Sequence, residues 1–190
     1  TAGSATGALL PTGNIKDEID GTEVTCIDNG MPVVVIRAED LGISGRETRD
    51  ELNTNENLKA RLEQIRLKAG PMMNLGDVTD KVIPKMSLIS APQIGGCVNS
   101  RTFIPHVCHA AVGVLGAVSI ATACILDGSV TNGIAVTAPG DQKQCSIEHP
   151  TGEFSVNLET EVIAGELNVK RSGLLRTARL LSRGDVYVQV

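Results

Sequence analysis

The sequence predicts an α+β domain in which a mixed β-sheet is wrapped around a central buried helix. Three observations carry this prediction: short β-branched runs separated by glycine turns, two amphipathic segments, and a stretch without Asp, Glu, Lys or Arg between Arg101 and Asp127. Residues 107–126 of that stretch are apolar on every side, and such a helix has to be buried on every side. Its Ala, Gly, Ser and Thr residues make it less hydrophobic than a membrane span, so we expect protein layers around it.

Most other elements are predicted by local patterns. Charged and apolar positions alternate with helical spacing over residues 47–69, with a break at Asn53-Thr54-Asn55 and an end at Gly70-Pro71. A second, basic helix is predicted at residues 174–182. Apolar and β-branched runs bounded by turn residues predict strands at residues 22–27, 32–36, 85–91, 100–104, 133–138, 144–148, 154–158, 161–169 and 186–190.

Composition narrows the class of partner. The chain has 190 residues, a net charge of -5 and only 2% aromatic residues. It therefore lacks the basic surface and the stacking platforms that bind nucleic acid, and neither nucleic acid nor a membrane is an expected partner. Five widely spaced cysteines and no apparent signal peptide predict free thiols in the cytoplasm. The chain opens on Thr1 rather than Met, which predicts that it is part of a longer protein.

Three glycine-containing turns are candidates for binding an anionic substrate. Glycine allows a ligand to approach backbone amides, while Asn and Thr add side-chain donors. Each turn alone is typical of ordinary structure, but together they predict a nest for carboxylates, since no cluster of arginines is expected that could bind them instead. The predicted substrate-binding residues in these turns are Thr12, Gly13 and Asn14, then Asn29, Gly30 and Met31, and finally His149, Pro150, Thr151 and Gly152.

A second candidate cluster lies where the buried helix is expected to begin. His106, Cys108 and His109 stand there, with Lys85 and Arg101 nearby in the predicted fold. A thiol at a helix N-terminus has a lowered pKa, so Cys108 and His109 are candidate catalytic acid/base residues. A buried thiol with a capping imidazole explains the pattern equally well. The spacing offers too few ligands for a metal site, so no metal is expected, and no nucleotide-binding motif is present.

Six motifs follow one another along the chain: Leu9-Leu10-Pro11-Thr12-Gly13-Asn14, Asp28-Asn29-Gly30-Met31-Pro32-Val33-Val34, Ala69-Gly70-Pro71-Met72-Met73-Asn74-Leu75-Gly76, Pro105-His106-Val107-Cys108-His109, Glu148-His149-Pro150-Thr151-Gly152 and Arg176-Thr177-Ala178-Arg179. Their order resembles the PrpF-like family of isomerases, which includes 2-methylaconitate isomerases and 4-oxalomesaconate tautomerases. Residues 7–20 and 28–36 are most similar to the tautomerase branch. One departure is Met73-Asn74, where the family pattern has Met-Gly.

The resemblance implies a diaminopimelate-epimerase-like fold and cofactor-free proton transfer on an unsaturated di- or tricarboxylate. It implies that residues 1–190 form the C-terminal domain of a two-domain isomerase, whose N-terminal half is a partner and supplies acid/base Lys and Cys residues. It also adds Met73 and His106 to the substrate-binding residues.

The residues leave two other functions open: an amino-acid racemase or epimerase of the same fold, and a non-catalytic carboxylate-binding domain. Racemases of this fold usually have Cys-Gly at the helix start, so Cys108-His109 favours the isomerase. Self-association into a homo-oligomer is also left open.

Overall fold

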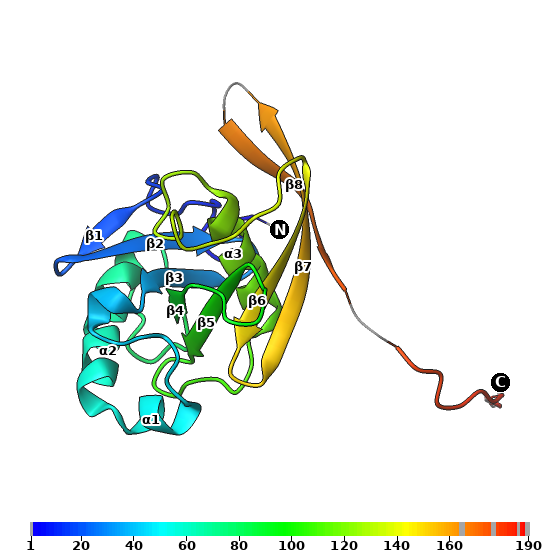
Figure 1. The fold of residues 1–190 in the computed structure, drawn as a ribbon, viewed down its shortest axis with the longest axis horizontal. Coiled ribbons are helices and arrows are strands. Elements are labelled where there is room, and N and C mark those ends of the chain that lie inside the picture. Colours follow the sequence, from blue (N-terminus) through cyan, green and yellow to red (C-terminus); the bar gives the residue numbers. More distant parts are fainter. Residues whose placement is uncertain (1, 164–165, 176–177, 186, 189–190) are drawn as a thin grey trace.

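The protein is described by a computed structural model, which covers residues 2–163, 166–175, 178–185 and 187–188 (Figure 1). Its described strands form one mixed sheet in which every strand pairs with the next one along the chain. In chain order the elements are β1 (Asp17–Ile19), β2 (Thr22–Asp28), β3 (Pro32–Arg37), η1 (Glu39–Leu41), α1 (Arg49–Thr54), α2 (Glu56–Met72), β4 (Lys85–Ser90), β5 (Val98–Phe103), α3 (Val114–Ile125), β6 (Gln142–His149), β7 (Gly152–Ile163) and β8 (Glu166–Leu174).

The sheet has a hydrophobic core on each face. On β3, Val33 and Val35 pack with α3, while Val34 and Ile36 pack with α1 and α2. Side chains alternate between faces along a strand, so a run of consecutive apolar residues is the pattern of a strand buried on both sides. β3 pairs in parallel with β4, and the chain between them contains α1 and α2. β5 pairs in parallel with β6, and the chain between them contains α3.

The central buried helix is confirmed. All ten residues from Gly116 to Ile125 are buried, and α3 contacts β2, β3, β6 and β7, so the sheet curves around it (Figure 1). The expected start was wrong, because α3 begins at Val114 and not at residue 107. The residues before it pair with β5 instead: Cys108 forms a β-bridge with Phe103, and the His109 N–H donates to the Thr102 carbonyl.

The predicted break between two helices on the other face is also confirmed. Asn55 ends α1, and its side-chain oxygen accepts from the Leu58 N–H to begin α2. The end of α2 was misplaced, because the helix continues through Pro71 to Met72. Asn74 follows with φ 59°, a left-handed conformation that Gly adopts freely and Asn tolerates. Asn74 is thus compatible with a backbone turn that Gly would adopt without strain.

Several other predicted elements differ from the structure. Residues 133 and 134 belong to a turn and 135–138 have no regular structure, so they form no strand, and residues 161–169 contain the end of β7 and the start of β8. The predicted helix at 174–182 is wrong for the described residues: Leu174 ends β8, and 175 and 178–182 have no regular structure. Leu180 and Leu181 are 82% and 86% exposed, so a helix there would have no surface to pack against.

Two further sequence features fall partly outside the described residues. In the predicted last strand at 186–190, residues 187 and 188 have no strand structure, while 186, 189 and 190 lie outside the description. Residues 176 and 177 of the sixth motif lie outside it as well. The short strand β1 was not predicted.

Candidate active site

A small pocket lies at the N-terminal end of α3. Gly113 is the N-cap residue and provides no side chain to cap the first turn. The first amides of a helix have no partner within the helix, and together with the helix dipole they favour an anion. The pocket, of about 240 Å³, is mostly apolar and is called the α3 pocket below; its lining residues are Met31, Lys85, Thr102, Ile104, Gly113, Val114, Leu115 and Gly116.

The turn between β2 and β3 is held against α3 by three hydrogen bonds. The Asn29 N–H donates to the Ser119 hydroxyl at 3.1 Å, and its side-chain amide donates to the Thr122 hydroxyl at 2.9 Å. The Ser119 hydroxyl in turn donates to the Met31 carbonyl at 2.7 Å. Asn29 is therefore a buried structural link, while Met31 reaches the α3 pocket.

Lys85 is the charged residue of the α3 pocket. Its ammonium donates to the Val82 carbonyl at 2.6 Å, and desolvation, together with the positive charge of Arg66, lowers the pKa of Lys85. A partly desolvated ammonium gains more from an opposite charge than one in free water. Lys85 and the helix amides can therefore act together on a carboxylate or on an enolate oxygen.

The third predicted turn lies beside the segment that leads into α3. The Thr151 hydroxyl donates to the Ala110 carbonyl at 2.9 Å. Desolvation lowers the pKa of His149, and the nearby His109 contributes to the lowering. Two of the three predicted turns therefore lie close to the start of α3. The turn at residues 29–31 lies beside Leu115, and the turn at residues 149–152 lies beside Ala110.

The two imidazoles are arranged as hydrogen-bond donors. Nδ1 of His109 accepts from the Ala111 N–H at 2.9 Å, and Nδ1 of His149 accepts from the Thr151 N–H at 3.3 Å. A neutral imidazole that accepts at Nδ1 carries its proton on Nε2. In this state His109 can donate to an anion through Nε2, whereas the His149 ring is also hydrogen-bonded to the Glu153 backbone.

The first predicted turn does not join the other two. Thr12 and Asn14 both donate to the Asp17 carboxylate, at 2.7 Å in each case, and Gly13 is exposed between them. Asp17 pairs with Val24 near the start of β2, whereas Asn29 follows its end. The single carboxylate nest expected from three turns is therefore corrected to two turns, because the donors of the first one already bind a carboxylate of the chain.

The expected position of Cys108 at a helix N-terminus is wrong. It lies six residues before the start of α3, fully buried in the core cluster that includes α1 and α2. Burial raises the pKa of the Cys108 thiol, and the positive charges of Arg101 and Arg49 only partly offset this. The expected lowering of its pKa is corrected, since the dipole effect acts only within the first helical turn.

Two other predicted binding residues also face the α2 side. Met73 is completely buried in the same core cluster. His106 is exposed, with Nδ1 3.8 Å from the Glu63 carboxylate on α2. The expected cluster of His106, Cys108 and His109 therefore separates in the structure. Among the described residues, no group of three or more His, Cys, Asp or Glu side chains is placed to hold a metal ion.

A second pocket, adjacent to Thr151, corrects the expectation that the chain has no arginine cluster. It has a volume of about 510 Å³ and is called the arginine pocket below. Arg46 and Arg49 flank the start of α1, and Arg101 comes from β5, so only the fold brings the three guanidinium groups together. The lining residues are Arg46, Glu47, Thr48, Arg49, Asp50, Arg101, Ala110, Pro150 and Thr151.

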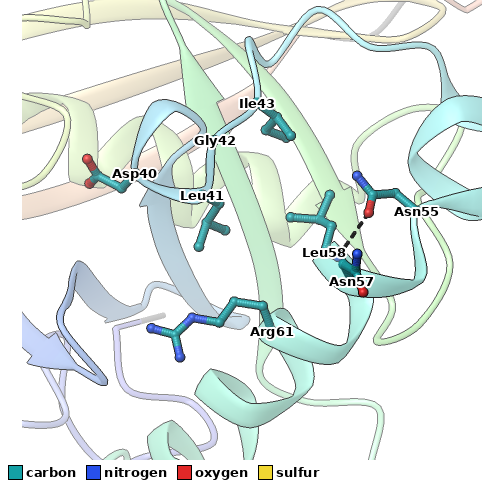
Figure 2. A pocket seen from close by; sticks show the side chains of 8 residues that line it. All are labelled: Asp40, Leu41, Gly42, Ile43, Asn55, Asn57, Leu58 and Arg61. Carbon is teal, nitrogen blue, oxygen red and sulfur yellow. Dashed lines mark hydrogen bonds between the residues drawn. The ribbon is translucent and has the colours of Figure 1, made fainter.

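A third hollow, of about 460 Å³, lies between η1 and α2 (Figure 2). Its Arg61 donates to the Asp20 carbonyl and the Thr22 hydroxyl, and its Asn55 side chain accepts from the Leu58 N–H. These polar groups serve the fold itself, so this hollow is a weaker candidate than the two pockets near α3. It is lined by Asp40, Leu41, Gly42, Ile43, Asn55, Asn57, Leu58 and Arg61.

No helix within the described part of the chain is long and apolar enough to cross a bilayer. A sheet curved around one small-residue helix, with a ligand pocket at the N-terminus of that helix, defines the class of diaminopimelate-epimerase-like α+β proteins. A crystal structure of methylitaconate-delta-isomerase has the same fold, with a TM-score of 0.77 and 24% identity, over 92% of this chain and 53% of that one.

The family follows from the sequence comparisons. The family model described as PrpF protein matches residues 1–189. The chain is 56% identical to the 4-oxalomesaconate tautomerase of Pseudomonas putida, over 98% of its own length and 51% of the relative. It is also 56% identical to the (4E)-oxalomesaconate Delta-isomerase of a Novosphingobium species, over 99% and 52%. The chain belongs to the PrpF family and spans about half the length of these curated relatives.

Proposed function

We propose that this chain is the C-terminal domain, residues 1–190, of a cofactor-independent isomerase that tautomerises an unsaturated tricarboxylate of the 4-oxalomesaconate type. The observation that carries the proposal is the 56% identity to relatives named for 4-oxalomesaconate chemistry. Proteins of the same family named 2-methyl-aconitate isomerase are only 29% identical, which favours the oxalomesaconate-like substrate over the methylaconitate-like one.

The pockets near α3 suit the charge changes of such a reaction. In a keto–enol tautomerisation, a base removes a proton from the carbon beside the carbonyl, the C–H electron pair forms the C=C bond, and the carbonyl oxygen gains a proton. Negative charge builds up on that oxygen before it is protonated. The α3 amides and Lys85 can stabilise this charge, and the Nε2 donor of His109 can assist.

The base itself is expected from the other half of the protein. Cys108 is buried with a raised pKa, and the two imidazoles donate rather than accept at Nε2 in their neutral form. These features agree with the expectation that Lys and Cys residues of the N-terminal half move the proton. The chain described here then supplies carboxylate binding and oxyanion stabilisation.

The N-terminal half is the partner that we propose for the exposed apolar residues after β8. In Figure 1 this stretch leaves the body of the domain. Four of its large side chains are between 78% and 94% exposed: Leu180, Leu181, Tyr187 and Val188. Such a group of exposed side chains in one short stretch calls for a covering surface.

The cysteines bear on the compartment in which the protein works. All five are free and buried, which supports the proposal of a reducing cytoplasm.

Proton exchange in D₂O tests the reaction directly. The complete two-domain protein and the 190-residue chain are each incubated with 4-oxalomesaconate, and ¹H NMR follows loss of the signal of the exchangeable C–H. We expect deuterium uptake and enol–keto conversion with the complete protein, and binding without exchange by the chain alone. If the complete protein exchanges 2-methylaconitate but not 4-oxalomesaconate, the substrate assignment shifts to 2-methylaconitate. Exchange of neither compound would overturn the proposed function.

A further inference from the structure

Arg101 is a buried cation with one side of its guanidinium unused. The residue is only 7% exposed. Its Nε donates to the Glu47 carbonyl at 3.0 Å, and Nη1 donates to the Asn99 side chain and the Ser100 carbonyl at 2.8 and 2.9 Å. Nη2 has no hydrogen-bond partner within the described residues, and Arg101 lines the arginine pocket. Guanidinium groups bind carboxylates through two parallel N–H bonds, so a free edge in a pocket is a ready receptor.

Two more arginines reinforce this charge. Arg49 uses Nε to donate to the Cys108 carbonyl at 2.9 Å, which holds its guanidinium beside the pocket, and Arg46 is exposed at the rim. Glu47 and Asp50 also line the pocket, and the buried Glu148 acts on Arg101 as well, so the case for an anion rests on the unpaired N–H groups and not on an excess of positive charge. The desolvated guanidinium of Arg101 has a lowered pKa, as expected for a buried cation without full compensation.

The Glu47 carboxylate partly offsets the charge of Arg101 through space, while its hydrogen bonds go elsewhere. One oxygen, Oε1, accepts from the Ser44 N–H and hydroxyl at 2.8 and 2.9 Å. The other, Oε2, is buried and has no hydrogen-bond partner among the residues that the structure describes. A carboxylate ligand has no proton to donate to Oε2, so this oxygen needs a water molecule, and the free edge of Arg101 is the group suited to the ligand.

The arginine pocket is connected to the α3 pocket through the backbone. Ala110 lines the first and Gly113 lines the second, so at most about 11 Å of chain separates the two positions. Arg101 and Thr102 are adjacent on β5 and line one pocket each, so their side chains point to opposite faces of the sheet and the two pockets flank this strand.

We propose that the arginine pocket binds one carboxylate of the substrate, through Arg101 Nη2 and the guanidinium groups of Arg49 and Arg46. This inference rests on the proposed function and deepens it, because it explains selection of a tricarboxylate over a dicarboxylate. The third carboxylate adds a charged contact that a dicarboxylate cannot make.

Calorimetry and kinetics on the complete protein test the pocket, with tricarballylate as an unreactive tricarboxylate probe. Charge-assisted hydrogen bonds contribute about 1.5–3 kcal/mol, so Arg101→Gln should weaken tricarballylate binding roughly tenfold to a hundredfold, and Arg49→Gln should weaken it severalfold. Both variants should raise KM for the substrate more than they lower kcat. Arg61→Gln, in the hollow of Figure 2, is the matched control and should bind like wild type.

The outcomes separate this inference from the proposed function. If Arg101→Gln is poorly folded, the exposed Arg46→Gln and Arg49→Gln carry the test, and their double variant should still lose at least tenfold in affinity. Wild-type affinity in a folded double variant, with normal turnover of 4-oxalomesaconate, overturns the pocket assignment and leaves the function intact. Inorganic phosphate that displaces tricarballylate completely at equal concentration overturns the carboxylate assignment. Tight tricarballylate binding without proton exchange on any substrate instead contradicts the proposed function.

Discussion

The hydroxyl of Thr151 donates to the backbone carbonyl of Ala110 across 2.9 Å, and this bond joins the β6–β7 turn to the segment that leads into α3. Both residues line the arginine pocket, and Ala110 precedes the N-cap of α3 by three positions. One side-chain hydrogen bond thus fixes a wall of the arginine pocket.

Replacement of Thr151 by Val should loosen that wall. The variant loses a neutral hydrogen bond with a net contribution of about 1 kcal/mol, so we expect a similar loss of unfolding free energy and a threefold to tenfold rise in the Kd for tricarballylate. Urea denaturation and calorimetry measure the two effects. Thr54→Val is the matched control, since Thr54 donates to the Asp50 carbonyl at the exposed end of α1, and its tricarballylate affinity should not change.

Cys108→Ala should reduce stability and leave catalysis unaffected. The thiol is buried in the α2-side core, so its removal should lower the unfolding free energy by about 1–2 kcal/mol. Because burial raises the pKa of the thiol, it should also react slowly with Ellman's reagent in the folded protein. Urea denaturation and steady-state kinetics of the complete protein check both expectations. A large fall in kcat with unchanged stability would restore Cys108 to the reaction.

His149 should make stability dependent on pH. Desolvation lowers the pKa of His149 in the folded state below its ordinary value of 6.5, so the unfolded chain binds its proton first. Stability from this group is therefore complete above about pH 6.5 and falls as the pH decreases from that value through the lowered folded-state pKa. His149→Gln should reduce the change of the urea midpoint with pH between pH 5 and 7. The exposed His106→Gln is the control and should retain the wild-type slope.

Asn29→Ala should release the β2–β3 turn from the central helix. The buried side-chain amide donates to the Thr122 hydroxyl and also to the Ser172 hydroxyl on β8, so its removal leaves buried acceptors without a donor. We expect a loss of about 1–3 kcal/mol in unfolding free energy. Asn168→Ala removes an exposed hydrogen bond to Glu161 and should change stability by less than about 0.5 kcal/mol. Similar losses in the two variants would contradict the proposed anchoring role of Asn29.

Local patterns were sufficient for much of the fold. The unbroken Val33-Val34-Val35-Ile36 run identified a strand buried on both faces, and the charge-free stretch identified the buried helix. The break near Asn55 was also predictable, because the Asn side chain competes for backbone hydrogen bonds and therefore favours helix ends. Each of these signals arises from neighbours within a few positions, so it is present in the sequence alone.

The positions of functional residues were less predictable. The apolar run before Val114 reads as helix, yet residues 108 and 109 pair with β5, because the strand offers hydrogen bonds that composition does not reveal. This shift moved Cys108 from a presumed helix terminus into the core. Of the three arginines in the arginine pocket, only Arg101 was named from the sequence, while Arg46 and Arg49 around the Thr48 N-cap resemble an ordinary exposed helix start.

The sequence by itself determined the α+β class, the buried small-residue helix and the membership of the PrpF family, since periodicity, turn residues and ordered motifs are local properties. Only the tertiary structure decided which side chains meet. Thr12 and Asn14 bind Asp17 within the chain, whereas Arg101 joins Arg46 and Arg49 across more than fifty positions. Such long-range neighbours depend on strand register and on the packing of the α1 region against β5, and neither is encoded in any single segment.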